Sequence, residues 1–341
     1  MNSRAKEEFT VALPFSLPGK IVCALLGAVA VARPAMALTI TPFFDTSITG
    51  AGNAVAEEGA INAAIVTIES LYSNSGTVGI VFAQSATILG QSDSADYTQS
   101  YAGYVSALTA VHLANLSNAI LASAVNHLST GNDANGALQI AATSAYFRVA
   151  LGISASGCFA SSGAFVSTCG QAYDGVVTIG NNLNDGPTPV AGQYSAIATA
   201  EHEINEILGG GGQGSTLGQS VSYFGPLDLD RYASAGTPSF TTAIGATAYL
   251  SVDGGVTNIV AFNQAASGDH ADFAVAGYVQ SAFGTPGTVP AYTSSSPDFA
   301  MMAAIGYNGV AVPEAGSLML LGTAFAGLWA ARRRPDRGIT A

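Results

Sequence analysis

The stretch Ala200-Glu201-His202-Glu203-Ile204-Asn205-Glu206-Ile207-Leu208-Gly209 decides how the fold of this chain is interpreted. It closes a predicted helix over residues 194–208, which must end at the four glycines of 209–212. Residues four apart lie on one helical face, about 5.4 Å apart along the axis, so His202 and Glu206 can bind a single ion. Glu203 lies about 100° round the helix, where it can reach a water on that ion and act as a general base.

The charges on this helix need an explanation because their neighbours are apolar. Ile197, Ile204, Ile207 and Leu208 predict a mostly buried helix, and a buried charge needs a partner or an ion. A solvated polar face is the alternative explanation. The gathering of four ionisable side chains within six residues of a charge-poor chain favours a metal site.

The motif resembles the His-Glu-x-x-His motif of zincins, with Glu206 in place of the second His. Zinc accepts carboxylate ligands at about 2.0–2.2 Å, although the added negative charge weakens the ion as a Lewis acid. Gly209 stands where metzincins turn the chain toward a third His ligand, but Gly212 occupies the position of that His. Residues 297–307 resemble the methionine-bearing segment beneath the metal of such enzymes, although its methionines also fit ordinary core packing.

Residues 200–307 resemble a family of secreted bacterial metalloproteases that often carry PEP-CTERM tails. The resemblance rests on the stretches 200–209, 227–232, 251–258, 268–272 and 298–307. It implies metal-dependent peptide hydrolysis, with His202 and Glu206 as ligands and Glu203 as base. The order of the predicted elements indicates an α+β fold. We expect a zincin- or metzincin-like single catalytic domain with a central active-site helix, a mixed sheet and a loop-rich C-terminal part.

A catalytic zinc commonly takes three protein ligands and a water, so a third ligand has to be found. We favour Asp228, which lies 22 residues after Glu206, beyond a glycine-rich loop that can fold back over the helix. His270 is the second choice, and the other candidates are Asp230, Asp269 and Asp272. Zn2+ is the expected cofactor, and Ca2+ is the alternative as a structural ion, because the candidate donors are rich in oxygen.

Hydrophobic periodicity supplies the remaining elements. Apolar residues at helical spacing predict helices over 54–72, 101–128, 142–151 and 298–305. Runs of β-branched and aromatic residues predict strands over 77–83, 174–180, 248–252 and 258–262. The body therefore divides into an N-terminal part, 38–190, and a metal-site part, 191–310.

Both ends of the chain indicate export. Lys20, an apolar run over 21–32 and Ala35-Met36-Ala37 predict a signal peptide over 1–37, which signal peptidase cleaves after Ala37. At the other end, Val312-Pro313-Glu314, an apolar stretch over 317–331 and three arginines at 332–334 follow the positive-inside rule. Residues 311–341 resemble the PEP-CTERM sorting signal, which an exosortase cleaves in that family. A short N-terminal membrane anchor and an ordinary tail anchor are the alternatives.

These signals predict export across the inner membrane of a Gram-negative-type bacterium, transient anchoring, and delivery to the cell surface or the medium. The delivered body, 38–310, has 18 acidic side chains against two Arg, a formal charge of −16. Because such a surface repels nucleic acid, no nucleic-acid partner is expected. Cys158 and Cys169 predict a local disulfide in an oxidising compartment, with two free thiols as the alternative.

The leading hypothesis is an exported zinc-dependent endopeptidase whose peptide or protein substrate the sequence does not identify. The second is a non-catalytic surface, matrix or adhesive protein with a structural or degenerate metal site, suggested by Glu206 in place of His and by Gly212. The third is a calcium-stabilised module. Metal content and peptide cleavage separate the three.

Overall fold

The computed structural model describes residues 38–129, 139–219 and 222–310. The predicted signal peptide and region 311–341, with Val312, Pro313, Glu314 and the apolar stretch 317–331, lie outside the described residues. Among the helices that are described, none is long and apolar enough to cross a membrane. Several sheets and helices share the described part of the chain, which agrees with the predicted α+β class.

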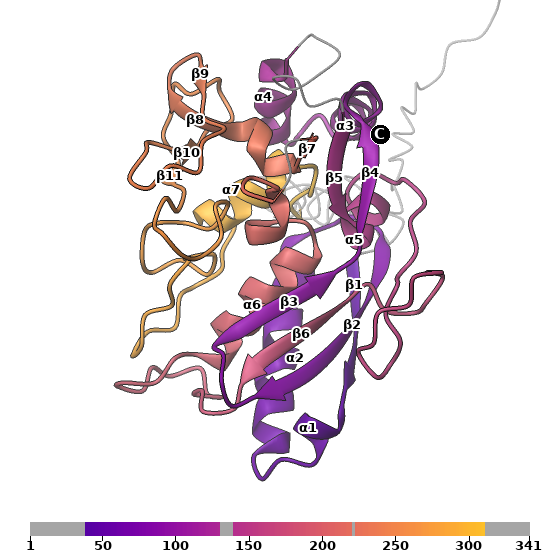
Figure 1. Cartoon of the computed structure of the whole chain (residues 1–341), viewed down its shortest axis with the longest axis vertical. Helices are drawn as coiled ribbons and strands as arrows, with labels where there is room; N and C mark the ends of the chain where they lie inside the picture. The colour runs from indigo at the N-terminus through magenta and orange to yellow at the C-terminus, as the bar shows by residue number, and fades with distance from the viewer. Residues whose placement is uncertain (1–37, 130–138, 220–221, 311–341) are drawn as a thin grey trace, which may run out of the picture. The chain divides into compact units, whose positions relative to one another are not determined.

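The sheet closest to the predicted site has four strands (Figure 1). They are, in order across the sheet, β1 (Leu38–Phe44), β2 (Gly76–Ser85), β6 (Gly175–Gly180) and β3 (Gly90–Ser94). β1, β2 and β6 run parallel to one another, whereas β3 is antiparallel to β6 and forms an edge. Among the described strands, β3 therefore pairs only with β6.

The two-residue period of the strands gives this sheet two different faces. On one face, Val177 belongs to the main hydrophobic core. On the other face, Val176 and Val81 join a small cluster that contains Cys158. The structure joins Cys158 to Cys169 in a disulfide, which closes a loop on this second face.

Two helices cover the core face of the sheet. α2 (Ala54–Leu71) contacts β1, and α6 (Ala196–Ile207) contacts α2, β3 and β6 (Figure 1). The hydroxyl of Ser195 caps the start of α6 by accepting a hydrogen bond from the amide of Ala198 at 3.2 Å. At the other end, the amide of Gly210 donates to the carbonyl of Asn205 at 2.8 Å, so the glycine run ends the helix as expected.

The predicted helix over 101–128 is two helices. α3 (Tyr101–Ala114) ends at Asn115, and α4 (Ala119–His127) begins after Asn118, whose side chain accepts a hydrogen bond from the amide of Leu121 at 3.0 Å. An asparagine cap competes with helix continuation, and this overrides the alanine-rich pattern.

Further short elements come from the N-terminal part, except for one strand over 223–224, which comes after α6. They include a three-stranded sheet, in which β5 lies between β4 and β7, and two short helices. Their bounds are β4 (Asp96–Ser100), β5 (Gln139–Thr143), β7 (Tyr223–Phe224), α1 (Thr46–Thr49) and α5 (Ser144–Val149).

After α6 the chain is rich in loops, as predicted. A small antiparallel sheet has the order β11-β10-β8-β9, and two 3-10 helices precede it. The bounds are η1 (Gly211–Gly214), η2 (Pro226–Asp230), β8 (Arg231–Ser234), β9 (Thr237–Pro238), β10 (Tyr249–Leu250), β11 (Val260–Ala261) and α7 (Pro297–Ala304). The long loop between β11 and α7 returns to α6 and brings further side chains to the site.

Candidate metal centre

The register of β3 aims two of its residues at α6. Ser92 lies opposite Val177 and Gly90 opposite Ile179, so both face the core side of the sheet, where α6 lies. The Ser92 hydroxyl donates to Oε2 of Glu206 at 2.6 Å. The edge strand and the helix therefore build one wall of the site together.

His202 and Glu206 lie on one face of α6, as their spacing predicted. His202 Nε2 lies 3.6 Å from Glu206 Oε1. The other ring nitrogen, Nδ1, lies 3.0 Å from the carbonyl oxygen of Val279. An imidazole that donates from Nδ1 to a carbonyl presents the lone pair of Nε2, which is the usual arrangement of a metal-ligating histidine.

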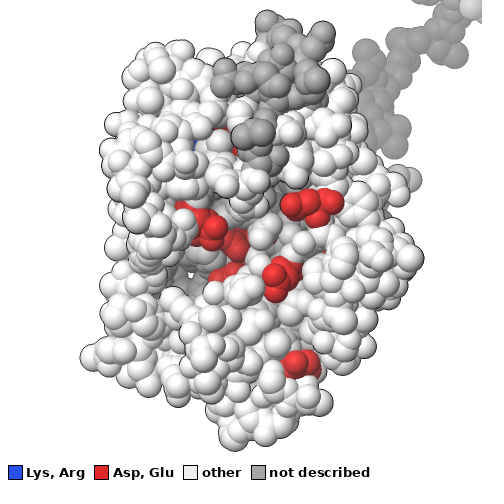
Figure 2. All heavy atoms as spheres, viewed as in Figure 1, with Lys and Arg blue, Asp and Glu red and all other residues white. Residues whose placement is uncertain are grey.

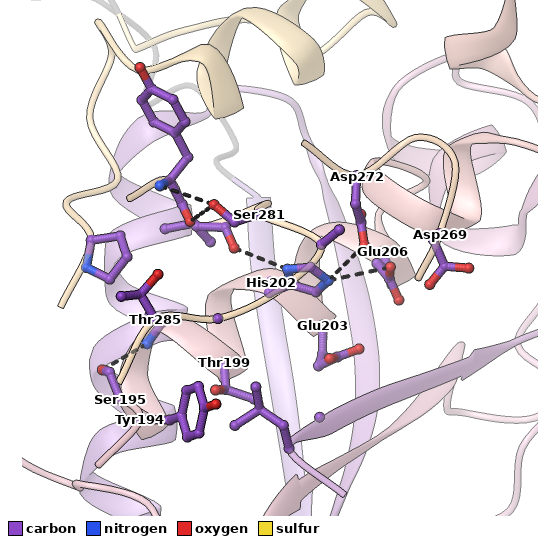
Figure 3. Close-up of a pocket in the computed structure, with 18 of the residues that line it drawn as sticks. Tyr194, Ser195, Thr199, His202, Glu203, Glu206, Asp269, Asp272, Ser281 and Thr285 are labelled. Atoms are coloured by element: carbon purple, nitrogen blue, oxygen red, sulfur yellow. Dashed lines mark hydrogen bonds and ion pairs between the residues drawn. The ribbon is translucent and has the colours of Figure 1, made fainter. Parts of the chain in front are cut away.

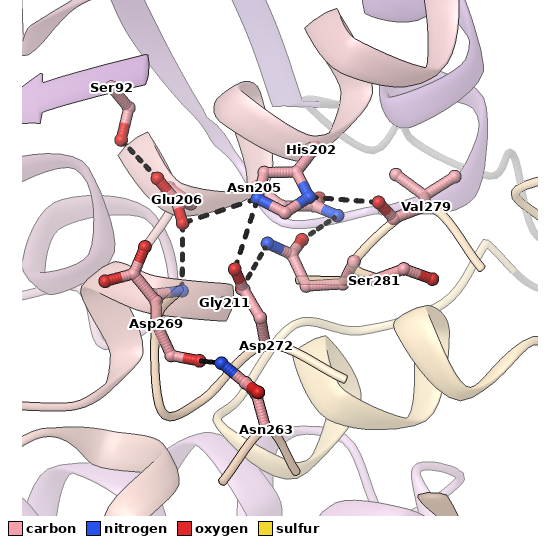
Figure 4. A network of polar contacts seen from close by, with 12 residues as sticks. Ser92, His202, Asn205, Glu206, Gly211, Asn263, Asp269, Asp272, Val279 and Ser281 are labelled. Atoms are coloured by element: carbon pink, nitrogen blue, oxygen red, sulfur yellow. Dashed lines mark hydrogen bonds and ion pairs between the residues drawn. The ribbon is translucent and has the colours of Figure 1, made fainter. Parts of the chain in front are cut away.

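The third member of the candidate site comes from the long loop, and it is Asp272. Its Oδ2 lies 3.5 Å from His202 Nε2 (Figure 4). The three candidate donor atoms of His202, Glu206 and Asp272 all lie within 4.8 Å of one another. Within 38–129, 139–219 and 222–310, this is the one such group of His, Cys, Asp or Glu side chains.

The two separations that involve His202 fit a tetrahedral ion. Ligands that lie about 2.0–2.2 Å from a tetrahedral zinc are about 3.3–3.6 Å from one another, close to the 3.5 and 3.6 Å found for His202 with Asp272 and Glu206. Both carboxylates of the group also accept hydrogen bonds from neighbouring residues, and such outer-shell partners raise the affinity of metal sites. Glu206 accepts from Ser92 and from the amide of Gly212, and Asp272 accepts from Gln280.

The structure does not group Asp228, the third ligand predicted from the sequence, with His202 and Glu206. Asp228 is fully buried in η2, where its carboxylate accepts hydrogen bonds from the Ser215 hydroxyl and from the amides of Thr216 and Gly225. These hydrogen bonds hold the ends of the glycine-rich loop, so both oxygens of the Asp228 carboxylate already have partners within the protein. The loop does fold back over the helix, but it brings an amide, that of Gly212, to Glu206.

The other candidates also lie apart from the ligand triangle or at its margin. The Nδ1 atom of His270 lies 3.4 Å from the carbonyl of Asn263, and the backbone carbonyl of His270 accepts from the buried side chain of Arg231. Asp230 is buried at the end of η2. Asp269 lies at the edge of the pocket beside Glu206, exposed to solvent (Figure 3).

Glu203 faces the same pocket as the ligands (Figure 3). A methyl group at Gly90 would collide with the Glu203 carboxylate, so the absence of a side chain on β3 leaves room for Glu203. Thr199, one turn earlier, also lines the pocket there. This close approach ties the general-base candidate to the edge strand, which sequence spacing did not indicate.

The pocket encloses about 380 Å³ and has two chemically different ends. Near the ligands it is acidic, with Glu203 and Asp269 beside the triangle. At the start of α6 it is lined by Tyr194 and, among others, by Thr285. Figure 2 shows Asp and Glu side chains gathered at a hollow of this face, with almost no Lys or Arg in view.

Burial and neighbouring charges shift the acid–base behaviour of the pocket. Burial raises the pKa of Glu203 well above its usual range, and Glu206 raises it further. Burial would lower the pKa of His202, but Asp272 and Glu206 outweigh it and raise that pKa well above the usual range. Partial desolvation at the edge of the pocket and the negative charge of Asp272 raise the pKa of Asp269 to about 6. These side chains alone therefore retain protons that a divalent cation would displace.

Comparison with known families identifies the C-terminal tail. The PEP-CTERM protein-sorting motif matches residues 311–334, which include Val312, Pro313 and Glu314. No curated protein and no solved structure matches the chain. The chain thus carries a signal for export and membrane-associated sorting in Gram-negative bacteria, recognised by an exosortase-type enzyme.

Proposed function

We propose that the exported body is a metal-dependent peptidase with a zincin-like catalytic centre on α6. The observation that carries this proposal is the triangle of His202, Glu206 and Asp272 at ligand spacing, with Glu203 beside it in an open pocket. A buried structural ion would need no carboxylate on the wall of an open pocket next to it. Here a general-base candidate and space for a substrate adjoin the ligands.

The donor set suits zinc. Zinc binds both imidazole nitrogens and carboxylate oxygens, so one imidazole and two carboxylates can hold it and would leave a fourth position for water. A bound zinc would polarise a peptide carbonyl and lower the pKa of that water, although two carboxylate ligands weaken both effects. The charge of the ion would also lower the pKa of Glu203, so that its carboxylate can accept a proton.

The chain's own residues would then perform three tasks. His202, Glu206 and Asp272 hold the ion. Glu203 accepts the proton from the attacking water and passes it to the leaving amine. The edge of β3 that faces away from β6 pairs with no other described strand. It lies along the pocket and would offer backbone groups to an extended peptide, as in strand addition.

One further feature supports the resemblance to metzincins, and one departs from it. The sulfur of Met301, in α7, accepts a hydrogen bond from the amide of Gly211 at 3.5 Å, so the methionine segment packs beneath the loop that follows α6. Gly212 stands where those enzymes place a third His, and Asp272 supplies the third donor in its stead.

Glu203→Gln tests the proposal. We expect the full-length variant to retain zinc after dialysis and to lose peptide cleavage by at least about a hundredfold, because general-base catalysis contributes about 10²–10⁴. Glu201→Gln is a matched control. Glu201 is buried on the same helix, next to His202 in sequence, but it does not line the pocket. Full cleavage by Glu203→Gln would contradict the assignment.

An oxygen-rich donor set also suits a structural ion, so a non-catalytic surface or matrix protein is the second candidate. Two of the three ligands are carboxylates. That role predicts that removal of the metal lowers the melting temperature while no peptide in a broad library is cut. Elemental analysis of the dialysed protein decides between zinc and calcium.

A further inference from the structure

A network of hydrogen bonds between buried amide side chains begins at Asp272, the third candidate ligand. Gln280 Nε2 donates to Asp272 Oδ1 at 3.0 Å, and Asn205 Nδ2 donates to Gln280 Oε1 at 3.3 Å. Both Gln280 and Asn205 are fully buried. Asn205 is the residue between Ile204 and Glu206 in the metal-site motif, so the hydrogen-bond network leads back to α6 (Figure 4).

The hydrogen-bond network continues from Asn205 to two tyrosines. The Tyr292 hydroxyl donates to Asn205 Oδ1 at 3.0 Å, and it lies 2.7 Å from the hydroxyl of Tyr72 on the other side. The backbone amide of Gln280 donates to Asp298 Oδ1 at 2.7 Å, which fixes this residue from a second direction. Every polar atom of the two amide side chains used here therefore has a partner.

The Asp272 carboxylate determines which atoms donate and which accept throughout this hydrogen-bond network. An ionised Asp272 only accepts hydrogen bonds, so Gln280 must present Nε2 to it. Gln280 Oε1 then faces Asn205 Nδ2, and Asn205 Oδ1 faces the hydroxyl of Tyr292. Neither amide can rotate by 180° without placing two acceptors or two donors together. The hydrogen-bond network therefore holds Asp272 in one orientation.

The glycine loop leaves space for this arrangement. A methyl group at Gly211 would collide with the side-chain amide of Gln280 and come within 3.0 Å of Asp272 Oδ1. Gly211 also has φ +49, a conformation that favours glycine. The loop thus encloses Gln280 against the third ligand.

We propose that Gln280 is the positioning residue of Asp272, held in place by Asn205. The metal helix then supplies two ligands directly and orients the third through Asn205 and Gln280. This inference rests on the metal site of the proposed function. It gives a role to Asn205, a residue that the His-Glu-x-x-Glu pattern leaves unspecified.

Zinc affinity of Gln280→Met tests the proposal, measured on the full chain by competition with a chromogenic chelator. We expect the affinity to fall about 10–100-fold, as for the loss of other outer-shell partners of metal ligands. Gln264→Met is the matched control. Gln264 is also buried in the C-terminal part, but within the described residues neither atom of its amide has a hydrogen-bond partner. It should bind zinc within about twofold of the wild type.

Two further measurements separate positioning from general damage. The visible absorption of the Co2+-loaded protein should change in Gln280→Met and not in Gln264→Met, because it reports the geometry of the ligands. Asn205→Leu should weaken zinc binding as well, and adding it to Gln280→Met should cause little further loss, because both act on Asp272 through one path.

Three results are distinguishable. If the wild type retains no zinc, the proposed function fails. If the wild type retains zinc and Gln280→Met matches its affinity and its cobalt spectrum, the positioning role is overturned while the metal site stands. If Gln280→Met does not fold, Asn205→Leu decides, and unchanged affinity in that folded variant overturns the proposal.

Discussion

Gly212 shows at the scale of one residue how this site departs from the metzincin pattern. Its amide donates to Glu206 Oε1 at 3.0 Å, and a methyl group on it would lie 2.5 Å from the same oxygen and 2.7 Å from the Asp269 carboxyl carbon. A histidine at this position would therefore displace the Glu206 carboxylate. Glycine is required here because the close contact between the backbone and Glu206 leaves no room for a side chain.

We expect Gly212→Ala to weaken zinc binding by about tenfold or more, because the added methyl group forces the Glu206 carboxylate to shift. Chelator competition measures the change. Gly59→Ala is the control, since a methyl group at that helical glycine has no atom within 4 Å. Equal affinities in the two variants would show that Glu206 is not held by the loop.

Asp230 gives a prediction for pH at the same scale. Burial raises its pKa to about 8, whereas the unfolded chain has a pKa of about 3.9. Between these values the folded chain keeps a proton that the unfolded chain has lost. The free energy of unfolding therefore falls as pH rises from about 4 to 8, by up to about 1.4 kcal/mol per pH unit, and then levels off.

Asp230→Asn should remove this contribution. We expect the variant and the wild type to be equally stable near pH 4, and the variant to be more stable by at least about 1 kcal/mol near pH 8. Urea unfolding at several pH values measures the difference. A constant difference between the two proteins across this range would mean that Asp230 does not titrate as described.

The sequence placed with assurance only the part of the site that lies on one helix; it listed Asp272 among the candidates for the third ligand but ranked Asp228 and His270 above it. His202, Glu203 and Glu206 are placed by helical spacing, which is local. Asp272 is 66 residues beyond Glu206, in a loop without periodicity, so no spacing rule relates the two. Asp228 looked better placed, but burial gives its carboxylate backbone partners in place of an ion.

At the scale of elements, segments with a strong hydrophobic pattern were predicted well, whereas β3, which has little such pattern, was not predicted. α2 and β6 lie within one or two residues of their predicted ranges. β3 reads Gly-Gln-Ser-Asp-Ser, with no β-branched or aromatic residue, and it is a strand because β6 offers it a partner. β1 contains Pro42, which a central strand would not tolerate but an edge strand does.

The disulfide loop is an element whose loss should leave the site intact. Replacing Cys158 and Cys169 by serine releases a short loop, and loop-closure entropy predicts a cost of about 3 kcal/mol. Because the loop packs on the sheet face opposite α6, we expect zinc affinity to remain unchanged. Chemical unfolding and chelator competition on the same protein check both statements. A parallel loss of zinc affinity would show that the two sheet faces are coupled.

At the scale of the whole molecule, the body is short of positive charge. Of its two arginines, Arg148 lies 2.6 Å from Asp174 and Arg231 is fully buried, so neither is a free surface cation. The pocket is also acidic (Figure 2). A divalent ion would offset Glu206 and Asp272, which leaves the charges of Glu203 and Asp269 uncompensated.

This imbalance predicts which peptides the proposed enzyme prefers. We expect peptides with Lys or Arg near the cleaved bond to show kcat/KM at least about tenfold above matched peptides with Glu, because the potential of the pocket attracts cations. Raising the ionic strength should reduce the ratio, since salt screens exposed charges. Asp269→Asn should also reduce it, because Asp269 is an exposed pocket carboxylate outside the ligand triangle. Ser281, on the pocket wall, provides the control through Ser281→Ala, which changes no charge. If Asp269→Asn cuts both peptide sets with the wild-type ratio, the field of the whole body, and not this carboxylate, sets the preference.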